Sequence, residues 1–254
     1  MDWTYVHLLI AFGGAFVAGM INALAGNGSV ITLTILTELL GVSGNVANGT
    51  NRVGVLMNSA GALTGFRNND RAHFSSWKRY ILPVIFGAVC GIYIATIVTD
   101  TQFLWVFRIM MIVMLFVILA RPERWLITLP EKSLAPKWVE IPVMFVLGVY
   151  GGFIQMGMGV FYLAVLVLIA RIPMIEANAI KAVAIGIFTV LAILIFALNG
   201  QVVWFFGLIM GVGQFFGGWF SAHYASKLPG SAKLAYYVLI VAVLLSLFKL
   251  FDVF

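Results

Sequence analysis

The chain has 254 residues, of which 63% are hydrophobic and only 9% are charged. So little polar surface cannot cover a water-soluble globule of this size, which indicates an integral membrane protein. The 15 Lys and Arg residues give a net charge of +6, but they gather in short loops between apolar segments, as in cytoplasmic loops. Nucleic acid is therefore not an expected partner. The only cysteine, Cys90, excludes an intrachain disulfide.

Ten apolar segments follow one another, five in each half of the chain. The second segment of each half has about 14 residues, which is short for a crossing of a ~30 Å hydrocarbon core and compatible with a re-entrant or broken segment. The segments of the first half are expected near 5–25, 28–41, 45–66, 77–99 and 102–120. Those of the second half are expected near 139–155, 158–171, 174–198, 202–226 and 231–252.

Two glycine-rich stretches divide the chain into two repeats. The stretch 19–29, followed by 47–51, corresponds to 148–159, followed by 177–181. We therefore predict a single transmembrane domain, 1–254, built from repeat 1 at 1–120, a cytoplasmic linker at 121–138 and repeat 2 at 139–254.

Loop charges predict that the two repeats are inserted upside down relative to each other. The loop before the fourth segment carries Arg67, Arg71, Lys78 and Arg79, whereas the equivalent turn of the second half, 199–201, carries no charge. Corresponding loops then lie on opposite sides of the membrane. The predicted fold class is an all-α polytopic membrane protein with two inverted repeats. Each repeat has a glycine-broken or re-entrant hairpin followed by three spanning helices, which gives about 8–10 membrane segments in total.

Each repeat carries a short glycine-rich turn, which we call a tip. The first tip (26–29) places Gly26 and Gly28 around the amide of Asn27, and the Ser29 hydroxyl can cap a helix that starts at about residue 30. The second tip (155–159) has the same glycine spacing, with Gln155 as the polar residue and glycines at Gly157 and Gly159. Exposed backbone N–H groups at such turns can bind an anion. The alternative role is close helix packing through small residues.

Two cations lie inside the apolar segments that follow the tips. Arg52 is about seven residues into its segment, roughly 10 Å from the helix end. Lys181 lies at a similar depth in the second half and aligns with Asn51 or Arg52. A positive charge at such depth costs about 2.5–3.5 kcal/mol unless it meets a counter-ion, a cavity or the surface. Snorkelling to the surface is the alternative.

Amides accompany these cations. Asn48 and Arg52 are four residues apart and share one helix face, while Asn51 and Asn58 share another. With Thr50, these side chains can donate hydrogen bonds to an oxyanion, and the amide oxygens can bind a dehydrated cation. Interhelical hydrogen bonding is the alternative.

Groups for acid–base chemistry are sparse. Glu38 and Glu176 are interpreted as the only carboxylates within apolar segments, and both lie near segment ends, which favours the surface. His7, His73 and His223 are scattered and have neither metal-ligand spacing nor a nucleophile beside them. We therefore expect neither an enzyme nor a bound metal or cofactor.

Tryptophans are predicted to mark the membrane surfaces. Trp219 is the exception and is expected to pack between helices. The residues at or beyond segment ends are Trp3, Trp77, Trp105, Trp125, Trp138 and Trp204.

The residues at 19–32, the stretch 47–51 and the later Gly61, Phe66 and Arg67 together resemble the sulfite exporter TauE/SafE family, also called the toluene-sulfonate uptake permease family. The resemblance covers nearly the whole chain, because the second half carries a degenerate copy. It implies a multi-pass protein of a prokaryotic cytoplasmic (inner) membrane that moves sulfite, sulfoacetate, other sulfonates or related organic anions.

Together, these features and the resemblance predict a secondary transporter for a small sulfur-containing oxyanion that works by alternating access. A transporter of another organic anion or an anion channel is the alternative, and an intramembrane enzyme or a scaffold fits less well. The partners are then the anion, membrane lipid, H⁺ or Na⁺ as a coupling ion, and a second copy of the chain in a homodimer. The predicted substrate-binding residues are Gly26, Asn27, Gly28, Ser29, Asn48, Thr50, Asn51, Arg52, Gln155, Gly157, Gly159 and Lys181.

Overall fold

The computed structural model describes residues 5–24, 26–66, 74–119 and 137–224, and the single positions 237, 240, 241 and 244. All regular elements of these residues are helical, as predicted. The predicted linker, 121–138, and the last apolar segment, 231–252, lie largely outside the described residues. So do the basic loop residues Arg67 and Arg71.

The helix bounds agree closely with the predicted segments. In the first half the elements are α1 (Tyr5–Leu24), α2 (Ser29–Thr34), η1 (Ile35–Leu39), α3 (Gly44–Phe66), α4 (Phe74–Ile97) and α5 (Asp100–Leu119). In the second half they are α6 (Lys137–Phe153), α7 (Met158–Ala164), η3 (Val165–Ile169), α8 (Met174–Leu198) and α9 (Trp204–His223). Within the described residues, four stretches are long and apolar enough to cross a membrane: Tyr5–Leu24, Trp77–Ile97, Glu176–Leu198 and Trp204–His223.

The short second segment has the same shape in both halves. An α-helical turn (α2 or α7) passes into a π-helical stretch (η1 or η3), a wide form of helix that is rare and frequent at functional sites. The next turn matches too, because Gly41 and Arg171 both have a positive φ, of 64° and 62°. Ser29–Leu39 and Met158–Ile169 are both too short to count as full spans.

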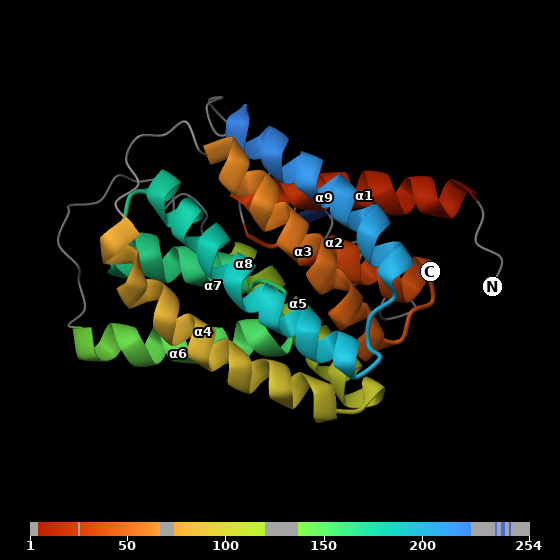
Figure 1. Ribbon diagram of the computed structural model, residues 1–254, viewed down its shortest axis with the longest axis horizontal. Helices are drawn as coiled ribbons and strands as arrows, with labels where there is room; N and C mark the ends of the chain where they lie inside the picture. The colour runs from red at the N-terminus through yellow and green to blue at the C-terminus, as the bar shows by residue number, and fades with distance from the viewer. Residues whose placement is uncertain are drawn as a thin grey trace.

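The long helices pack in an order that reads the same from either end. α1 packs against α9, α9 against α3, α3 against α8, α8 against α4, and α4 against α6. Figure 1 shows α3 and α9 side by side, and α4 and α6 side by side on the opposite flank. Exchanging α1 with α6, α9 with α4 and α3 with α8 maps this order onto itself. The matching helices of the two halves thus occupy matching places.

Small residues bring the outer helix pairs into backbone contact. A Cβ atom added to Gly87 or Gly91 of α4 would overlap carbonyl oxygens of α6, and one added to Gly217 of α9 would overlap a carbonyl oxygen of α1. This close approach is typical of helix packing within membranes. The small-residue stripes of α4, α6, α1 and α9 therefore serve packing rather than binding.

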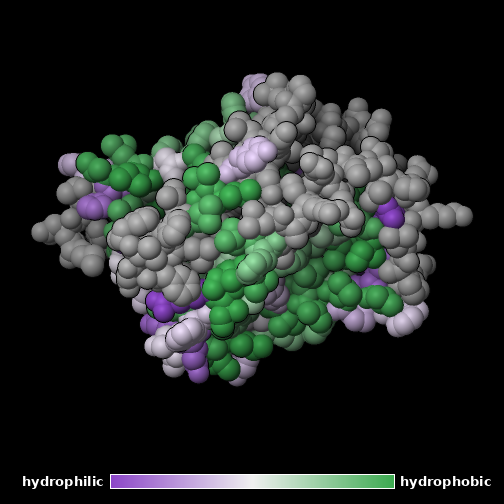
Figure 2. All heavy atoms as spheres, turned by 180° about the vertical axis from the view of Figure 1, so that it is seen from behind, coloured by the Kyte–Doolittle hydropathy of each residue, from purple (hydrophilic) through white to green (hydrophobic). Residues whose placement is uncertain are grey.

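The outer surface suits a lipid environment. Phe86, Val146 and Leu194 are 65%, 63% and 56% exposed. Figure 2 shows that hydrophobic residues cover much of one face, while hydrophilic residues lie toward its ends. Such an exposed apolar surface excludes a monomeric soluble protein.

Tryptophan placement was predicted in part. Trp105, Trp138 and Trp204 are 58%, 76% and 51% exposed, as expected near segment ends. Trp77 is 2% exposed, so its predicted place at the surface is wrong. Its indole N–H donates to Glu176 at 3.0 Å, which satisfies the polar atom of a buried ring.

Candidate functional site

The two tips touch each other. A Cβ atom on Gly159 would lie 2.5 Å from the carbonyl oxygen of Gly26, and one on Gly26 would lie 2.5 Å from the carbonyl carbon of Gly159. Gly26 also has a φ of 82°, which favours glycine. Residues that are 133 positions apart in the chain therefore meet at a junction where no side chain fits between the backbones.

This contact predicts an asymmetric response to two glycine substitutions. Gly159→Ala must push the two tips apart, so we expect a loss of about 1–3 kcal/mol of stability and slower transport. Gly13→Ala is the matched control, because a Cβ there meets nothing within 4 Å and alanine favours a helix interior by about 0.5–1 kcal/mol. Thermal unfolding of both variants in detergent measures the difference, and equal melting temperatures would contradict the tip contact.

Arg52 of α3 binds the carboxyl end of α6. Its Nη1 donates to the carbonyl oxygen of Gly151 at 2.9 Å and to Oε1 of Gln155 at 2.7 Å. Its Nη2 donates to the carbonyl oxygens of Gly152 at 2.7 Å and Phe153 at 3.3 Å. These carbonyls are the ones a helix end leaves unpaired, and a cation is favourable there. Arg52 is 0% exposed, so the alternative of snorkelling is wrong.

Lys181 of α8 binds the carboxyl end of α1 in the same way. Its ammonium donates to the carbonyl oxygens of Asn22 at 2.9 Å and Ala23 at 3.2 Å, and to Oδ1 of Asn178 at 2.8 Å. Lys181 is 4% exposed, which again excludes snorkelling. Each half of the chain therefore supplies a cation to the end of the first helix of the other half.

Several of the predicted residues hold polar atoms that lack a hydrogen-bond partner in the part of the chain that the structure describes. All of these atoms are buried, and all except Oδ1 of Asn27 belong to N–H donors. The unpartnered atoms are Nδ2 and Oδ1 of Asn27, Nδ2 of Asn51, Nε of Arg52 and Nε2 of Gln155. A buried donor left unpaired costs about 1–3 kcal/mol, so each of these donors needs an explanation, such as a bound ion or water molecule.

Hydrogen bonds and chain position connect these residues to the tip junction. Gln155 accepts a hydrogen bond from Arg52, and Oδ1 of Asn51 accepts one from the hydroxyl of Thr32 in α2 at 2.6 Å. Asn27 directly follows Gly26 at the junction, and it is 0% exposed. α3 therefore contacts Gln155 of the second tip and, through Asn51, the helix α2 that follows the first tip.

Gln155 has a strained backbone. Its φ of 60° lies in the left-handed region, which non-glycine residues seldom adopt. Such strain persists where surrounding contacts enforce it, and it is frequent at functional sites. At Gln155 the side-chain bond to Arg52 and the following Gly157, with a φ of 74°, supply that support.

The side chains of three other predicted residues differ in their contacts. Ser29 makes no capping hydrogen bond at the start of α2, where Gly28 is the N-cap residue, so the predicted cap is wrong. The Thr50 hydroxyl accepts from the backbone N–H of Val203 at 2.9 Å, at the start of α9. Asn48 donates to the carbonyl oxygen of Phe153 at 2.8 Å and accepts from Arg52, which fixes the guanidinium.

Sequence reasoning missed two buried polar groups. Gln214 of α9 accepts from Asn58 through its backbone oxygen at 2.9 Å, and its own Nε2 has no partner among the described residues. Glu140 is 2% exposed and forms an ion pair with Arg79, so the view of Glu38 and Glu176 as the only carboxylates in apolar segments is wrong. Glu140 lies inside the predicted segment 139–155 and was visible in the sequence, whereas its partner Arg79 and the contact of Gln214 with Asn58 depend on packing between distant helices.

A small polar cavity lies beside Lys181. It has a volume of about 10 Å³, close to the room that one water molecule needs. α1 contributes Asn22 and Ala23, α3 contributes Asn58, Ser59 and Ala62, and α8 contributes Asn178, Lys181, Ala182 and Ile185. Asn22 donates to Asn58 at 2.8 Å across it.

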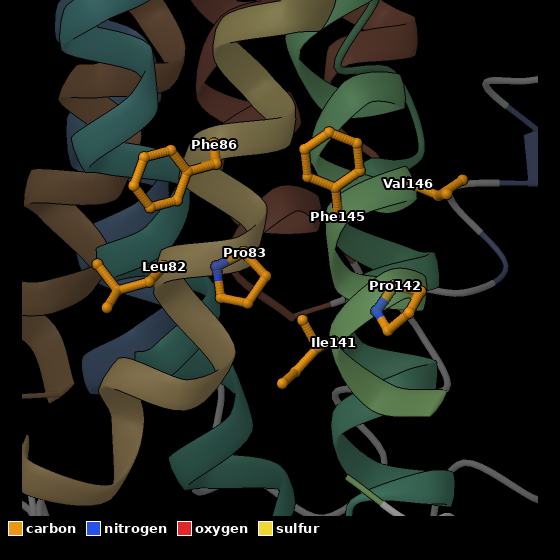
Figure 3. A pocket seen from close by; sticks show the side chains of 7 residues that line it. All are labelled: Leu82, Pro83, Phe86, Ile141, Pro142, Phe145 and Val146. Carbon is orange, nitrogen blue, oxygen red and sulfur yellow. The ribbon is translucent and has the colours of Figure 1, made fainter. Parts of the chain in front are cut away.

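A larger groove of about 470 Å³ lies elsewhere, on the outer face of α4 and α6. Figure 3 shows Leu82, Pro83 and Phe86 projecting from α4 beside Ile141, Pro142, Phe145 and Val146 of α6. All seven side chains are apolar, so the groove offers no group that could bind a charged substrate. It is excluded as the candidate site.

Comparison with known proteins agrees with this architecture. The chain matches the family described as Sulfite exporter TauE/SafE over residues 11–248. It is 27% identical to the "Probable membrane transporter protein ORF9" of Sinorhizobium sp, over 99% of this chain and 95% of that protein. It is 25% identical to the "Probable membrane transporter protein YfcA" of Escherichia coli (strain K12), over 96% and 89% of the two chains. No solved structure matches. The chain therefore belongs to the sulfite exporter TauE/SafE family and is a membrane transporter.

Proposed function

We propose that the protein is a secondary transporter that binds a small sulfur-containing oxyanion at the junction of the two tips. The observation that carries this proposal is the set of buried N–H donors of Asn27, Asn51, Arg52 and Gln155 that have no partner among the described residues. Sulfite and the sulfonates present several acceptor oxygens on one compact group. Such an anion satisfies those donors and meets the permanent charge of Arg52.

The charge balance supports an anion over a cation. Among the described residues, none of the hydrogen-bond acceptors of Arg52 is a carboxylate, and the same holds for Lys181. A buried charge without a counter-ion is costly, and inside membrane proteins such a charge commonly marks a substrate pathway. The bound anion reduces that cost.

Alternating access between inverted halves is the mechanism that fits this site. The proposal is supported by the matching short helices, by the packing order that is symmetric under exchange of the halves, and by the reciprocal helix-end contacts of Arg52 and Lys181. Transporters with such repeats bind substrate where the halves meet and expose it by moving one against the other. The cytoplasmic membrane of a prokaryote is the proposed location.

Flux through proteoliposomes tests this function. Vesicles containing the purified protein are loaded with unlabelled sulfite or methanesulfonate, and uptake of the radiolabelled anion is followed with empty vesicles as the control. We expect saturable uptake that is accelerated by anion on the opposite side. Absence of uptake of both anions would overturn the proposal, and large unitary currents in planar bilayers would assign the protein to the anion channels instead.

A further inference from the structure

The two helix-end cations differ in one chemical respect. The guanidinium of Arg52 stays protonated in proteins, whereas an amine such as that of Lys181 can lose its proton in a buried site. They lie at nearly the same depth, since Arg52 is eight residues after Gly44, the start of α3, and Lys181 is seven residues after Met174, the start of α8. One half of the chain thus holds a fixed charge and the other a charge that can be removed.

The surroundings of Lys181 allow both forms. Its three hydrogen-bond acceptors are neutral, namely two carbonyl oxygens and an amide oxygen. None of the other residues that line the adjoining cavity is titratable, and the cavity has room for about one water molecule. Water is thus the partner that can take up or deliver a proton there.

Other titratable groups on the helices packed against α8 are engaged elsewhere or lie toward helix ends. Arg52 of α3 contacts the end of α6, and Arg79 of α4 pairs with Glu140 of α6. Glu176 of α8 itself accepts from Trp77, and the hydroxyl of Tyr162 in α7 donates to the carbonyl oxygen of Tyr80 in α4. The remaining groups are Tyr5 and His7 of α1, Lys78, Cys90 and Tyr93 of α4, and Tyr150 of α6, whose hydroxyl donates to the backbone oxygen of Met156. None of these residues lines the cavity beside Lys181.

We infer that Lys181 carries the proton that crosses the membrane together with the anion, an inference that rests on the proposed function. Ala23, which accepts from Lys181, lies four residues before Asn27. A monoanion at the tips stabilises the ammonium form by charge attraction. After the anion leaves, the buried ammonium has lost that attraction, and it gives its proton to water in the cavity and becomes a neutral amine. The amine regains a proton from water on the other side, so one proton and one monoanion move together without net charge.

The substitution Lys181→Arg separates the two steps. Arginine keeps a cation at the end of α1 but cannot release its proton. In proteoliposomes we expect exchange of radiolabelled methanesulfonate across the membrane to persist at a reduced rate, because the cation at the end of α1 is kept. Methanesulfonate is a strong-acid anion, so it carries no proton itself. Accumulation driven by a pH gradient of about one unit, which supports about tenfold accumulation for one proton per anion, is expected to disappear.

A control variant and a measurement on wild type complete the test. The wild-type measurement does not depend on how well Lys181→Arg folds. Lys78→Arg, at an exposed position of α4, is the matched control and should accumulate the anion as wild type does. In wild-type vesicles, a trapped pH dye should report acidification of the lumen as methanesulfonate enters. Full pH-driven accumulation by Lys181→Arg, or anion entry without acidification, would overturn the role of Lys181 and leave the proposed function intact. Absence of any methanesulfonate or sulfite exchange by wild type would overturn both.

Discussion

Replacing Asn27 by leucine is expected to stabilise the protein and abolish its transport. The Asn27 side chain is 0% exposed, and neither of its polar atoms has a hydrogen-bond partner within the described residues. Each such atom costs about 1–3 kcal/mol, so an apolar side chain of similar size should raise the free energy of unfolding by about that amount. An anion that depends on the Asn27 amide would then lose its donor, and uptake should fall by at least about tenfold. Thermal unfolding and proteoliposome flux measure the two effects.

Thr189→Val provides the matched control for this prediction. The Thr189 hydroxyl of α8 is also buried without a partner among the described residues, but it lies two helical turns beyond Lys181. We expect a similar gain in stability with unchanged transport. If Asn27→Leu transports normally, Asn27 has no part in substrate binding. If it unfolds more easily than wild type, its side chain makes contacts that contradict its unpartnered state.

Arg52→Gln is expected to produce the largest loss of stability. The guanidinium donates to the carbonyl oxygens of Gly151, Gly152 and Phe153, and glutamine cannot reach all of them with its two N–H donors. Removing a buried charged group from its partners costs about 3–5 kcal/mol. The strained turn at Gln155 loses its support as well. We therefore expect a clear fall in melting temperature and no measurable uptake.

Arg52→Lys separates charge from geometry at the same position. Lysine keeps the positive charge but has three donors in place of five, so we expect a smaller loss, of about 1–3 kcal/mol, and weaker anion binding. Arg108→Lys in α5 is the control, because this side chain is partly exposed and its guanidinium carbon lies 5.9 Å from the centroid of the Trp105 ring. It should change stability by about 0.5 kcal/mol or less. Normal uptake by Arg52→Gln would contradict a site role for Arg52.

Local sequence patterns predicted the helices and the two tips well. Unbroken apolar runs placed the long helices to within about three residues, because helix length and hydrophobic span are local properties. The glycines of the tips were recognised by their spacing, and the structure brings Gly26 and Gly159 into contact. The depth of Arg52 and Lys181 in their segments left a buried site and snorkelling as alternatives, and the structure shows that both side chains are buried.

The partners of those cations could not be predicted, because they are contacts between distant parts of the chain. Arg52 meets Gly151 across 99 positions, and Lys181 meets Asn22 across 159. Arg52 and Lys181 can stay buried because α6 and α1 end beside α3 and α8, where their last carbonyl oxygens accept hydrogen bonds. The predicted surface position of Trp77 is wrong for the same reason, since the carboxylate that accepts its N–H belongs to α8, 99 positions away. An apolar segment end looks alike whether it faces lipid or another helix.

The helix-end contacts of Arg52 and Lys181 offer a link between anion binding and relative motion of the two halves. Arg52 joins α3 to the end of α6, and Lys181 joins α8 to the end of α1, while the tips that follow α1 and α6 touch each other. An anion that draws on the donors of both tips would act on both connections at once. A ligand shifts a conformational equilibrium only through such differential contacts.

The binding of an anion at the tips is tested most directly by the melting temperature of the purified protein in detergent. Wild type and Asn27→Leu are each measured with sulfite, methanesulfonate and sulfoacetate, and with acetate and chloride as reference anions. A ligand at 100 times its dissociation constant stabilises the native state by about 2.7 kcal/mol. The tip site predicts a concentration-dependent rise for wild type with a sulfur oxyanion and no rise for Asn27→Leu. No rise with any sulfur oxyanion, or an equal rise in both proteins, would contradict it.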